Sequence, residues 1–136
     1  MAMHNNRDHR KRAAAWLASE LSALLAQQGF RVSPGRHYFD CGGVVLACYD
    51  PRADGDDRDA MPNPDHIYFA VDDLDSVYER AQALGGLSTE TGDGNLAMGK
   101  VAQRPWGERS FYLRDPFGNR LCFVDSGTVF RGPGPA

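Results

Sequence analysis

The sequence lacks the features that would place it in several large functional classes. It has no apolar run near the ~20 residues needed to cross a bilayer, so no membrane span is expected. Lys and Arg form no dense stripe outside the first dozen residues and the net charge is -3, so nucleic acid is not expected as a partner. No Ser–His–Asp nucleophile set, phosphate-binding glycine loop or dinucleotide fingerprint is present.

Cysteine is also scarce, and its arrangement excludes two further classes. The three cysteines, Cys41, Cys48 and Cys122, are odd in number and lack CxxC spacing, which favours neither a disulfide framework nor a zinc ribbon. Residues 1–12 are polar and lack the apolar segment of a secretory signal. We therefore expect a cytoplasmic protein with reduced thiols.

What is present suits one domain, because 136 residues can bury a sizeable core. Residues 1–12 are expected to form a loose arm. Residues 13–28, rich in Ala, Leu, Glu and Gln, predict a helix with Asp8 as a possible N-cap and Gly29 as its end. Its leucines share one side at helical spacing, which indicates that the helix covers a sheet.

Three strands are predicted next, at residues 30–32, 36–40 and 44–50, the last two joined across Cys41-Gly42-Gly43. Residues 44–49 are nearly all apolar, which is typical of a strand buried on both faces. Residues 51–64 are acidic and rich in Pro, Gly and Asp. They predict a solvated linker rather than a calcium loop, since the closing Glu of such a loop is absent.

After this linker the order of elements restarts. Residues 66–71 alternate as a strand, and residues 74–84 predict a helix that begins after Asp72-Asp73 and ends at Gly85-Gly86. Residues 87–98 form a polar loop, and a strand is expected near residues 100–104.

The clearest local pattern is a hairpin within residues 104–125. Its turn is Asp115-Pro116-Phe117-Gly118, in which Asp binds backbone amides, Pro restricts φ and Gly118 supplies a positive φ. Alternation in the two strands places two sets of side chains on opposite faces: Ser110, Tyr112, Cys122 and Val124 on one, and Phe111, Leu113, Leu121 and Phe123 on the other.

Together these elements predict an α+β fold of paired βαβββ modules that form a curved mixed sheet around a cleft, the first module lacking a clear leading strand. The expected division is a domain at 13–126, with module one at 13–50, a linker at 51–64, module two at 65–126, and a tail at 127–136. The side chains expected to face the cleft are His66, Tyr68, Ser110, Tyr112 and Cys122 of module two and His37, Val45, Ala47 and Tyr49 of module one.

Three segments together resemble the vicinal-oxygen-chelate superfamily of glyoxalase I, extradiol dioxygenases, fosfomycin-resistance enzymes and bleomycin-binding proteins. Residues 65–86 and 104–125 are similar to the second half of such a protein, and residues 33–51 are similar to the end of its first module. The resemblance covers about residues 13–125. It implies the fold above, but the superfamily contains both enzymes and pure binding proteins.

The resemblance also implies where a divalent metal would bind. Metal-binding members typically use a His at the start of a module's first strand, where this chain has His66. They add a Glu four residues after the turn glycine, where this chain has Cys122, and Ala47 at the module-one counterpart. A module-one His would have to be His4 or His9. A metal enzyme needs about three protein ligands, so this chain departs from the metal pattern.

Each candidate residue has a structural alternative. His66 is either a ligand or a half-exposed hydrogen-bonding residue, and Cys122 is either a thiolate or a small buried side chain. Tyr68 and Tyr112 either bind a ligand or fill the cleft, and Trp106 either covers one end of the cleft or packs in a turn. The charged residues Arg104, Glu108, Arg109 and Arg114 are expected to form a surface ion-pair cluster rather than an anion site.

Two functions follow from these expectations. The first is a non-metal, small-molecule-binding protein of the antibiotic-sequestering type, which holds an aromatic or apolar ligand with Tyr49, Tyr68, Ser110, Tyr112, Trp106 and His37. The alternative is a lyase, isomerase or dioxygenase in which His66 helps hold Fe, Mn, Zn or Ni. A purely structural family member is a third option. A homodimer with modules paired or swapped between chains is expected, because the missing first strand leaves a sheet edge exposed.

Overall fold

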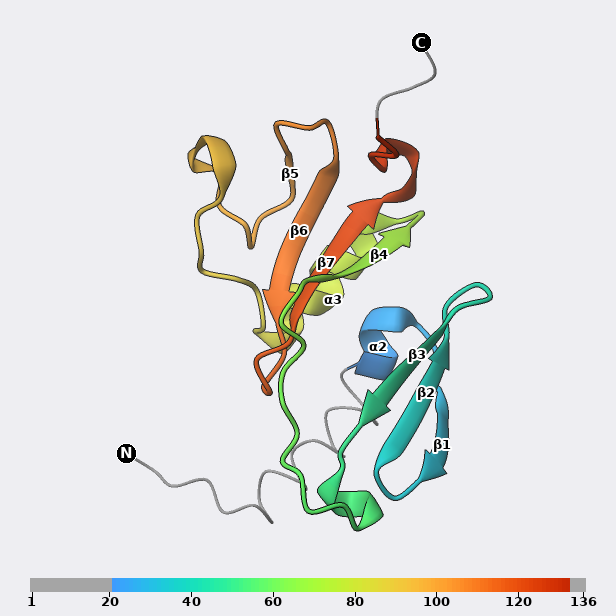
Figure 1. The fold of residues 1–136 in the computed structure, drawn as a ribbon. Helices are drawn as coiled ribbons and strands as arrows, with labels where there is room; N and C mark the ends of the chain where they lie inside the picture. The colour runs from blue at the N-terminus through green and yellow to red at the C-terminus, as the bar shows by residue number, and fades with distance from the viewer. Residues whose placement is uncertain (1–20, 133–136) are drawn as a thin grey trace. The chain divides into compact units, whose positions relative to one another are not determined.

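A computed structural model of the chain describes residues 21–132 and divides it into two compact units between Met61 and Pro62 (Figure 1). Among the described helices, none has the length and apolar character to cross a membrane. The expectations for the arm at 1–12, for Asp8, His4 and His9, and for the first turns of the helix at 13–28 lie outside the described residues.

The first unit contains a three-stranded antiparallel sheet. Its strands are β1 (Phe30–Ser33), β2 (Arg36–Asp40) and β3 (Val45–Tyr49), in the order β1-β2-β3. They confirm the three predicted strands, and every strand end lies within one residue of its predicted position. The short helix α2 (Ser22–Leu25) precedes them, so the described part of this unit has the predicted order of helix and three strands.

The predicted end of the first helix, at Gln28, is wrong. Helix α2 ends at Leu25, because Ala26 turns into the left-handed region with φ of 53°. The carbonyl of Gln28 is instead 2.9 Å from His37 Nε2, and it accepts a longer bond from the Ser22 hydroxyl. Gly29, at φ 67°, then passes so close to His37 and Phe39 that a side chain could not be accommodated there.

The expectation that β3 is buried on both faces is also wrong. Strand β3 is an outer strand of its sheet, and Val44 and Val45 are 70% and 55% exposed. An apolar run shows that a strand forms, but it does not distinguish a central strand from an edge strand.

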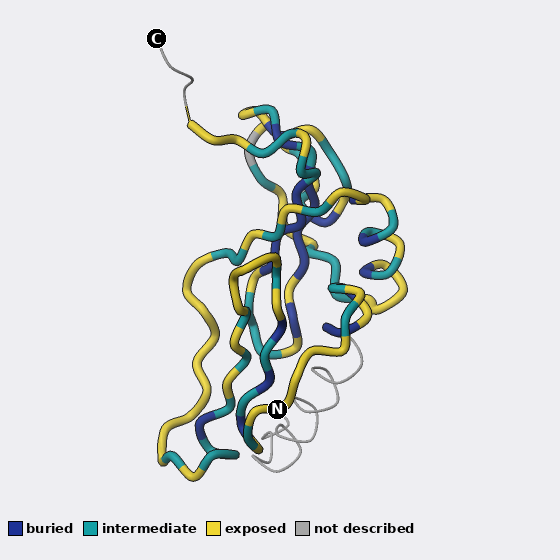
Figure 2. The backbone as a smooth tube through the Cα atoms, turned by 90° about the vertical axis from the view of Figure 1, so that its right-hand side faces the viewer, coloured by how far each residue is buried: buried dark blue, intermediate teal, exposed yellow. Residues whose placement is uncertain are grey.

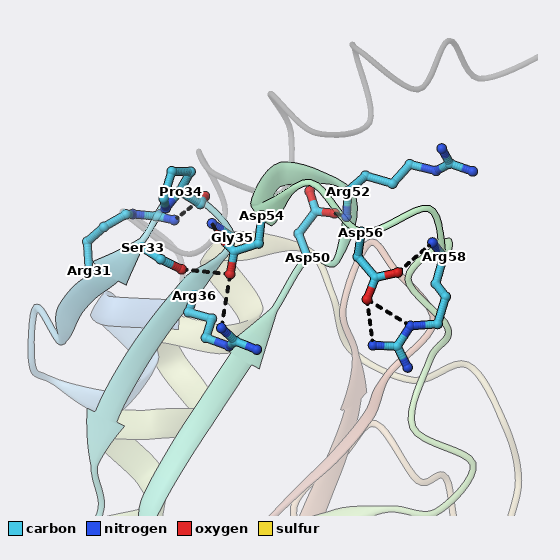
Figure 3. A network of polar contacts seen from close by, with 10 residues as sticks. All are labelled: Arg31, Ser33, Pro34, Gly35, Arg36, Asp50, Arg52, Asp54, Asp56 and Arg58. Carbon is cyan, nitrogen blue, oxygen red and sulfur yellow. Dashed lines mark hydrogen bonds and ion pairs between the residues drawn. The ribbon is translucent and has the colours of Figure 1, made fainter.

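The start of the acidic segment is folded onto the β1–β2 turn. Residues Arg52–Asp54 form a 3-10 turn, η2, and the Asp54 carboxylate accepts hydrogen bonds from the Ser33 hydroxyl and the Gly35 amide (Figure 3). Arg36 lies 3.2 Å from the same carboxylate, and these partners together lower the pKa of Asp54. Residues 57–65 are all exposed, including the yellow stretch that joins the two units in Figure 2.

The second unit follows the predicted order of strand, helix and three strands. Its elements are β4 (Ile67–Val71), α3 (Leu74–Leu84), β5 (Ala102–Gln103), β6 (Arg109–Arg114) and β7 (Arg120–Asp125), with 3-10 turns η3 (Asp93–Asn95) and η4 (Ser126–Thr128). The sheet order is β4-β7-β6-β5, with β4 and β7 parallel and the other pairs antiparallel. Asp73 caps α3 and Gly85 ends it in the left-handed region, as predicted. The fold is therefore α+β, with two sheets consistent with paired βαβββ modules.

Helix α3 covers one face of the second sheet, and the core of this unit lies between them (Figure 1). Phe123 of β7 stacks on Phe69 and Phe111 at centroid distances of 5.0 and 5.6 Å. Tyr78 of α3 meets the Phe111 ring edge-on at 5.2 Å. Burying an aromatic side chain of this size stabilises a fold by about 1.5–3 kcal/mol, so these rings hold the helix to the sheet.

Asp115 organises the turn of the β6–β7 hairpin. One carboxylate oxygen accepts from the Phe117 and Asn119 amides, and the other accepts from the Asn119 side chain at 2.7 Å. Gly118 has φ of 88°, as the turn chemistry predicted. Asp115 is itself buried, so its oxygens have little access to water.

Replacing Asp115 with Ala should therefore lower the free energy of unfolding by about 2 kcal/mol, because the turn amides lose their acceptor in a buried place. Urea unfolding followed by circular dichroism measures the change. Asp57→Ala, at an exposed aspartate, is the matched control. Equal stability of the two variants would contradict this role for Asp115.

Candidate functional site

The face of the second sheet that points away from α3 carries polar and aromatic side chains. We call this the tyrosine face; alternation in the strands places on it Tyr68 and Ala70 of β4, Ser110 and Tyr112 of β6, and Cys122 and Val124 of β7. This confirms the two faces expected for the hairpin. The opposite residues, including Phe69, Phe111 and Phe123, belong to the core under α3.

Three of these residues form a row across the strands. Cys122 is the register partner of Tyr68 on one side and of Tyr112 on the other. His66, just before β4, lies beside the row, with its ring 5.3 Å from that of Tyr112, edge-on, and 6.1 Å from that of Tyr68. The structure thus brings together four of the predicted site residues, with Ser110 next to Tyr112 on the same face.

The row is exposed at one end and buried at the other. Tyr68 is 57% exposed, whereas Tyr112 is 6% exposed and Cys122 is fully buried. Met98 and Val129 pack against Tyr112, Cys122 and Val124 and cover this inner part. A ligand that approaches the tyrosine face in this conformation therefore meets His66 and Tyr68 first.

Burial keeps the inner groups protonated. It raises the pKa of the Cys122 thiol to about 11, although hydrogen bonds from Tyr112 and Ser110 act in the opposite sense. The pKa of Tyr112 rises well above its usual range, through burial and then through the neighbouring Cys122. At neutral pH these groups are a thiol and a phenol, which donate hydrogen bonds and carry no charge.

Arg104 lies against the same face and is almost fully buried. Its Nε donates to the Ser110 hydroxyl at 3.1 Å, and its two terminal nitrogens donate to four backbone carbonyls, those of Ala97, Met98, Lys100 and Ser110. Its guanidinium carbon is 5.2 Å from the centre of the Tyr112 ring. Arg104 therefore fixes the loop that places Met98 over Tyr112.

Glu108 joins two segments beside this face. One of its carboxylate oxygens accepts from the Trp106 indole at 2.7 Å, and the other accepts from the Phe130 amide at 2.8 Å. Trp106 lies in the turn before β6 and is 40% exposed. The expected surface ion-pair cluster is wrong: Arg104 and Glu108 are buried and make no ion pair among the described residues, while Arg109 pairs with Asp75 and Arg114 with Glu90.

In the first unit, the structure separates the two predicted site residues. Tyr49 lies on the same sheet face as Val45 and Ala47, with the Arg36 guanidinium 4.3 Å above its ring. His37 pairs with Cys48 and lies on the opposite face, where it packs against Phe39 at 4.9 Å. The expectation that His37 shares a face with Tyr49 is therefore wrong, because the turn between β2 and β3 places an adjacent residue, Tyr38, opposite Ala47.

A hollow of about 290 Å³ also lies in the second unit, at the end of α3, lined by residues 85–90, Arg114 and Asp115. Its charged groups are already engaged, since Arg114 pairs with Glu90 and Asp115 binds the hairpin turn. It offers mainly backbone atoms and therefore little specific chemistry.

Sequence reasoning missed the roles of Arg104, Glu108, Met98 and Val129. For Glu108 a signal existed, because it has the same parity as Ser110 and Tyr112 in the alternating strand. Met98 and Val129 lie in irregular segments, where no periodicity indicates which side chains point inward.

Comparison with known proteins places these features in a family. The model of the glyoxalase/bleomycin resistance protein/dioxygenase superfamily matches residues 27–123. Among curated proteins, none matches the chain in sequence.

Solved structures with the same fold have different chemistries. Lactoylglutathione lyase from Agrobacterium tumefaciens is 22% identical, with 87% of this chain and 86% of that chain covered and a TM-score of 0.56. The oxidase ChaP-H2 is 21% identical, with 92% and 87% covered and a TM-score of 0.57. A bleomycin-binding protein complexed with bleomycin is 19% identical, with 84% and 90% covered and a TM-score of 0.54. At these identities the similarity shows the fold alone.

The residues present in the second unit do not fit a divalent metal ion. A resident metal needs about three protein ligands, and no group of three His, Cys, Asp or Glu side chains able to hold an ion occurs in the described part of the chain. Cys122, where the resemblance implies a carboxylate ligand in metal-binding members, is a buried thiol whose pKa of about 11 opposes the thiolate that a metal requires.

The raised pKa of Cys122 predicts a loss of stability at alkaline pH. The folded state binds the thiol proton more tightly than the unfolded state, so this contribution is present below about pH 9 and is lost as the pH rises toward 11. Between about pH 8 and about pH 10.5, the free energy of unfolding should fall in both the wild type and Cys122→Ala. The fall should be about 2 kcal/mol larger in the wild type, because only the wild type has this thiol. Urea unfolding at the two pH values measures this difference.

Cys48→Ala, at a half-buried thiol, is the control for losing a sulfur atom. If the wild type and Cys122→Ala lose the same stability over this range, Cys122 does not titrate as the structure indicates.

Proposed function

Because the chain belongs to the glyoxalase/bleomycin resistance protein/dioxygenase superfamily, we propose that it binds an aromatic small molecule on the tyrosine face without a resident metal. The observation that carries this proposal is the composition of that face. The ring of Tyr68 is exposed at the outer part of the face beside the half-buried ring of His66, and Cys122 is a neutral thiol where the resemblance implies a carboxylate in metal-binding members.

The chemistry of the face favours a planar ligand with polar edges. Exposed aromatic rings gain about 0.5–1.5 kcal/mol by stacking on another ring, beyond the burial of apolar area. The Tyr68 hydroxyl, whose pKa is raised by partial burial, remains a neutral hydrogen-bonding group at the edge of a bound ring. Antibiotic sequestration is the biological form of this proposal, supported by the shared fold with a bleomycin-binding protein.

In this proposal, residues 13–50 and 65–126 are the two modules, joined by a linker at 51–64. Tyr49 would contribute from module one, and Trp106 would cover one end of the ligand. The ligand set of the proposal is Tyr68, Trp106 and Tyr49, with Ser110 and Tyr112 behind them in the covered part of the face. His66 is an aromatic neighbour in this proposal rather than a metal ligand. The free thiols Cys41, Cys48 and Cys122 suit a reducing cytoplasm.

Replacing Tyr68 with Ala should weaken ligand binding about tenfold, because both the stacking ring and the hydroxyl are lost. Tyr68→Phe should weaken it only about threefold, since the ring remains. Bleomycin and the fluorescent aromatic 2-naphthol are suitable ligands, with dissociation constants measured by calorimetry and fluorescence. Leu84→Ala, at an exposed apolar residue of α3, is the control and should not change affinity.

The effect of metal ions on ligand binding is a second test of the proposal. Binding should be unchanged in EDTA and after incubation with Fe, Mn, Zn or Ni. Stoichiometric metal that survives purification without a His tag and disappears in His66→Ala would overturn the non-metal proposal.

A homodimer is part of the same proposal. Within the described residues no strand pairs with the outer edge of β3, where Val44 and Val45 are exposed. An exposed apolar edge strand is a site at which a second chain can add. The modules could then be paired or swapped between chains.

Replacing Val45 with Glu should shift the protein toward monomer, because a charge on this edge disfavours strand pairing. Sedimentation velocity of the wild type and the variant measures the change, with exposed Met61→Glu as control. A wild type that sediments only as a monomer would contradict the dimer.

A further inference from the structure

The inner half of the tyrosine face is covered by the last described segment of the chain. We call residues 126–130 the C-terminal cover; it begins with the 3-10 turn η4, directly after β7 (Figure 1). Its Val129 packs against Tyr112, Cys122 and Val124, and Met98 packs there from the other side. The groups beneath include the Tyr112 phenol and the Cys122 thiol beside hydrocarbon.

Five hydrogen bonds hold the cover within the described part of the chain, and two of them go to Asp125 at the end of β7. The Thr128 hydroxyl accepts from the Arg109 amide at 3.0 Å, the Ser126 hydroxyl donates to Asp72 at 2.7 Å, and the Phe130 amide donates to Glu108 at 2.8 Å. Val129 is half-buried and Phe130 is 56% exposed, so the cover buries little apolar surface. Segments with so little buried apolar surface open at a lower free energy than the strands they cover.

Glu108 is the residue on which the position of the cover depends most. It is only 9% exposed, and each of its oxygens is committed to one neutral donor, the Trp106 indole or the Phe130 amide. Since it makes no ion pair among the residues that the structure describes, its hydrogen bonds to these donors compensate for its burial. The same carboxylate thus connects the turn before β6 to the cover.

We propose that the C-terminal cover can detach from the sheet and that its hydrogen bond to Glu108 holds it in place. Detachment of the cover then opens an inner extension of the binding site, whose floor is formed by Ser110, Tyr112 and Cys122. The inference that a ligand uses this extension rests on the proposed function; the removable cover does not. The extension would take the part of an aromatic ligand that carries a hydrogen-bond acceptor such as a carbonyl or ring hydroxyl, because its floor presents protonated phenol, hydroxyl and thiol groups beside the Arg104 guanidinium.

Cys122 can report this movement, because it is fully buried in the cluster against which Val129 of the cover packs. The experiment measures the rate at which iodoacetamide alkylates each cysteine of the native protein, with the three cysteine peptides separated by mass spectrometry. In the wild type Cys122 should react more slowly than Cys41 and Cys48, which are half-buried.

Replacing Glu108 with Ala should raise the alkylation rate of Cys122 at least about tenfold, since a hydrogen bond to a charged acceptor that holds the cover is lost. Glu108→Gln should give a smaller increase, because its one carbonyl oxygen can accept from only one of the two donors. The rates at Cys41 and Cys48 in the same molecules should not change. Glu79→Gln, at an exposed glutamate of α3, removes the same charge and should leave all three rates unchanged.

A second variant guards against an effect of Glu108 on folding. Phe130→Pro leaves the carboxylate in place and removes the amide hydrogen that binds it, together with a largely exposed phenyl ring. It should also raise the rate at Cys122 alone. If Cys122 remains as unreactive in both Glu108→Ala and Phe130→Pro as in the wild type, the cover is a fixed part of the fold and the proposal fails. Equal acceleration at all three cysteines would indicate general unfolding and would also overturn it.

Ligand protection separates this inference from the proposed function. Saturating 2-naphthol should slow the alkylation of Cys122 in Glu108→Ala, because the ring occupies the extension. If 2-naphthol binds the wild type through Tyr68 but does not protect Cys122 in the variant, the extension is wrong while the proposed function stands. If Cys122 becomes reactive in the variant but no aromatic ligand binds, the proposed function fails while the removable cover stands.

Discussion

Strand β7 lies between β4 and β6 and is hydrogen-bonded to both, so each of its residues has a fixed neighbour on either side. On one face this pairing stacks Phe123 between Phe69 and Phe111 under α3. On the other face it sets Cys122 between Tyr68 and Tyr112. The core and the candidate site therefore arise from the same register, because a shift by one residue would exchange the two faces.

The position of Cys122 in this register explains its chemistry. A side chain at the centre of the sheet, under Met98 and Val129, loses its contact with water, and this loss raises the pKa of the thiol. The same site in a metal-using relative would need a charged ligand, whose burial is favourable only beside a cation. A protonated thiol removes that requirement. The face can then serve neutral, hydrogen-bonding recognition, on a fold that is shared by a lyase, an oxidase and a bleomycin-binding protein.

Two buried charges support the site without taking part in an ion pair among the described residues. Arg104 is neutralised by carbonyl dipoles and by the Ser110 hydroxyl, and it thereby fixes the loop that carries Met98. Glu108 is compensated by two neutral N–H groups and thereby fixes Trp106 and the C-terminal cover. Both residues act through what they position. Burying a charge is energetically unfavourable unless its hydrogen-bonding groups are paired. Arg104 and Glu108 are each paired with several groups of a nearby segment, and these bonds hold that segment in position.

The sequence alone determined the order of elements, the bounds of α3, the hairpin turn at Asp115 and the two faces of β6 and β7, because alternation, capping and turn preference are local properties. It also predicted that Tyr68, Ser110, Tyr112 and Cys122 share one face. Only the tertiary structure decided that β3 is an edge strand, that His37 packs against Phe39, and that Arg104 and Glu108 are buried. Each of these outcomes depends on contacts between segments that are far apart in the sequence. No periodic pattern in the chain indicates such contacts.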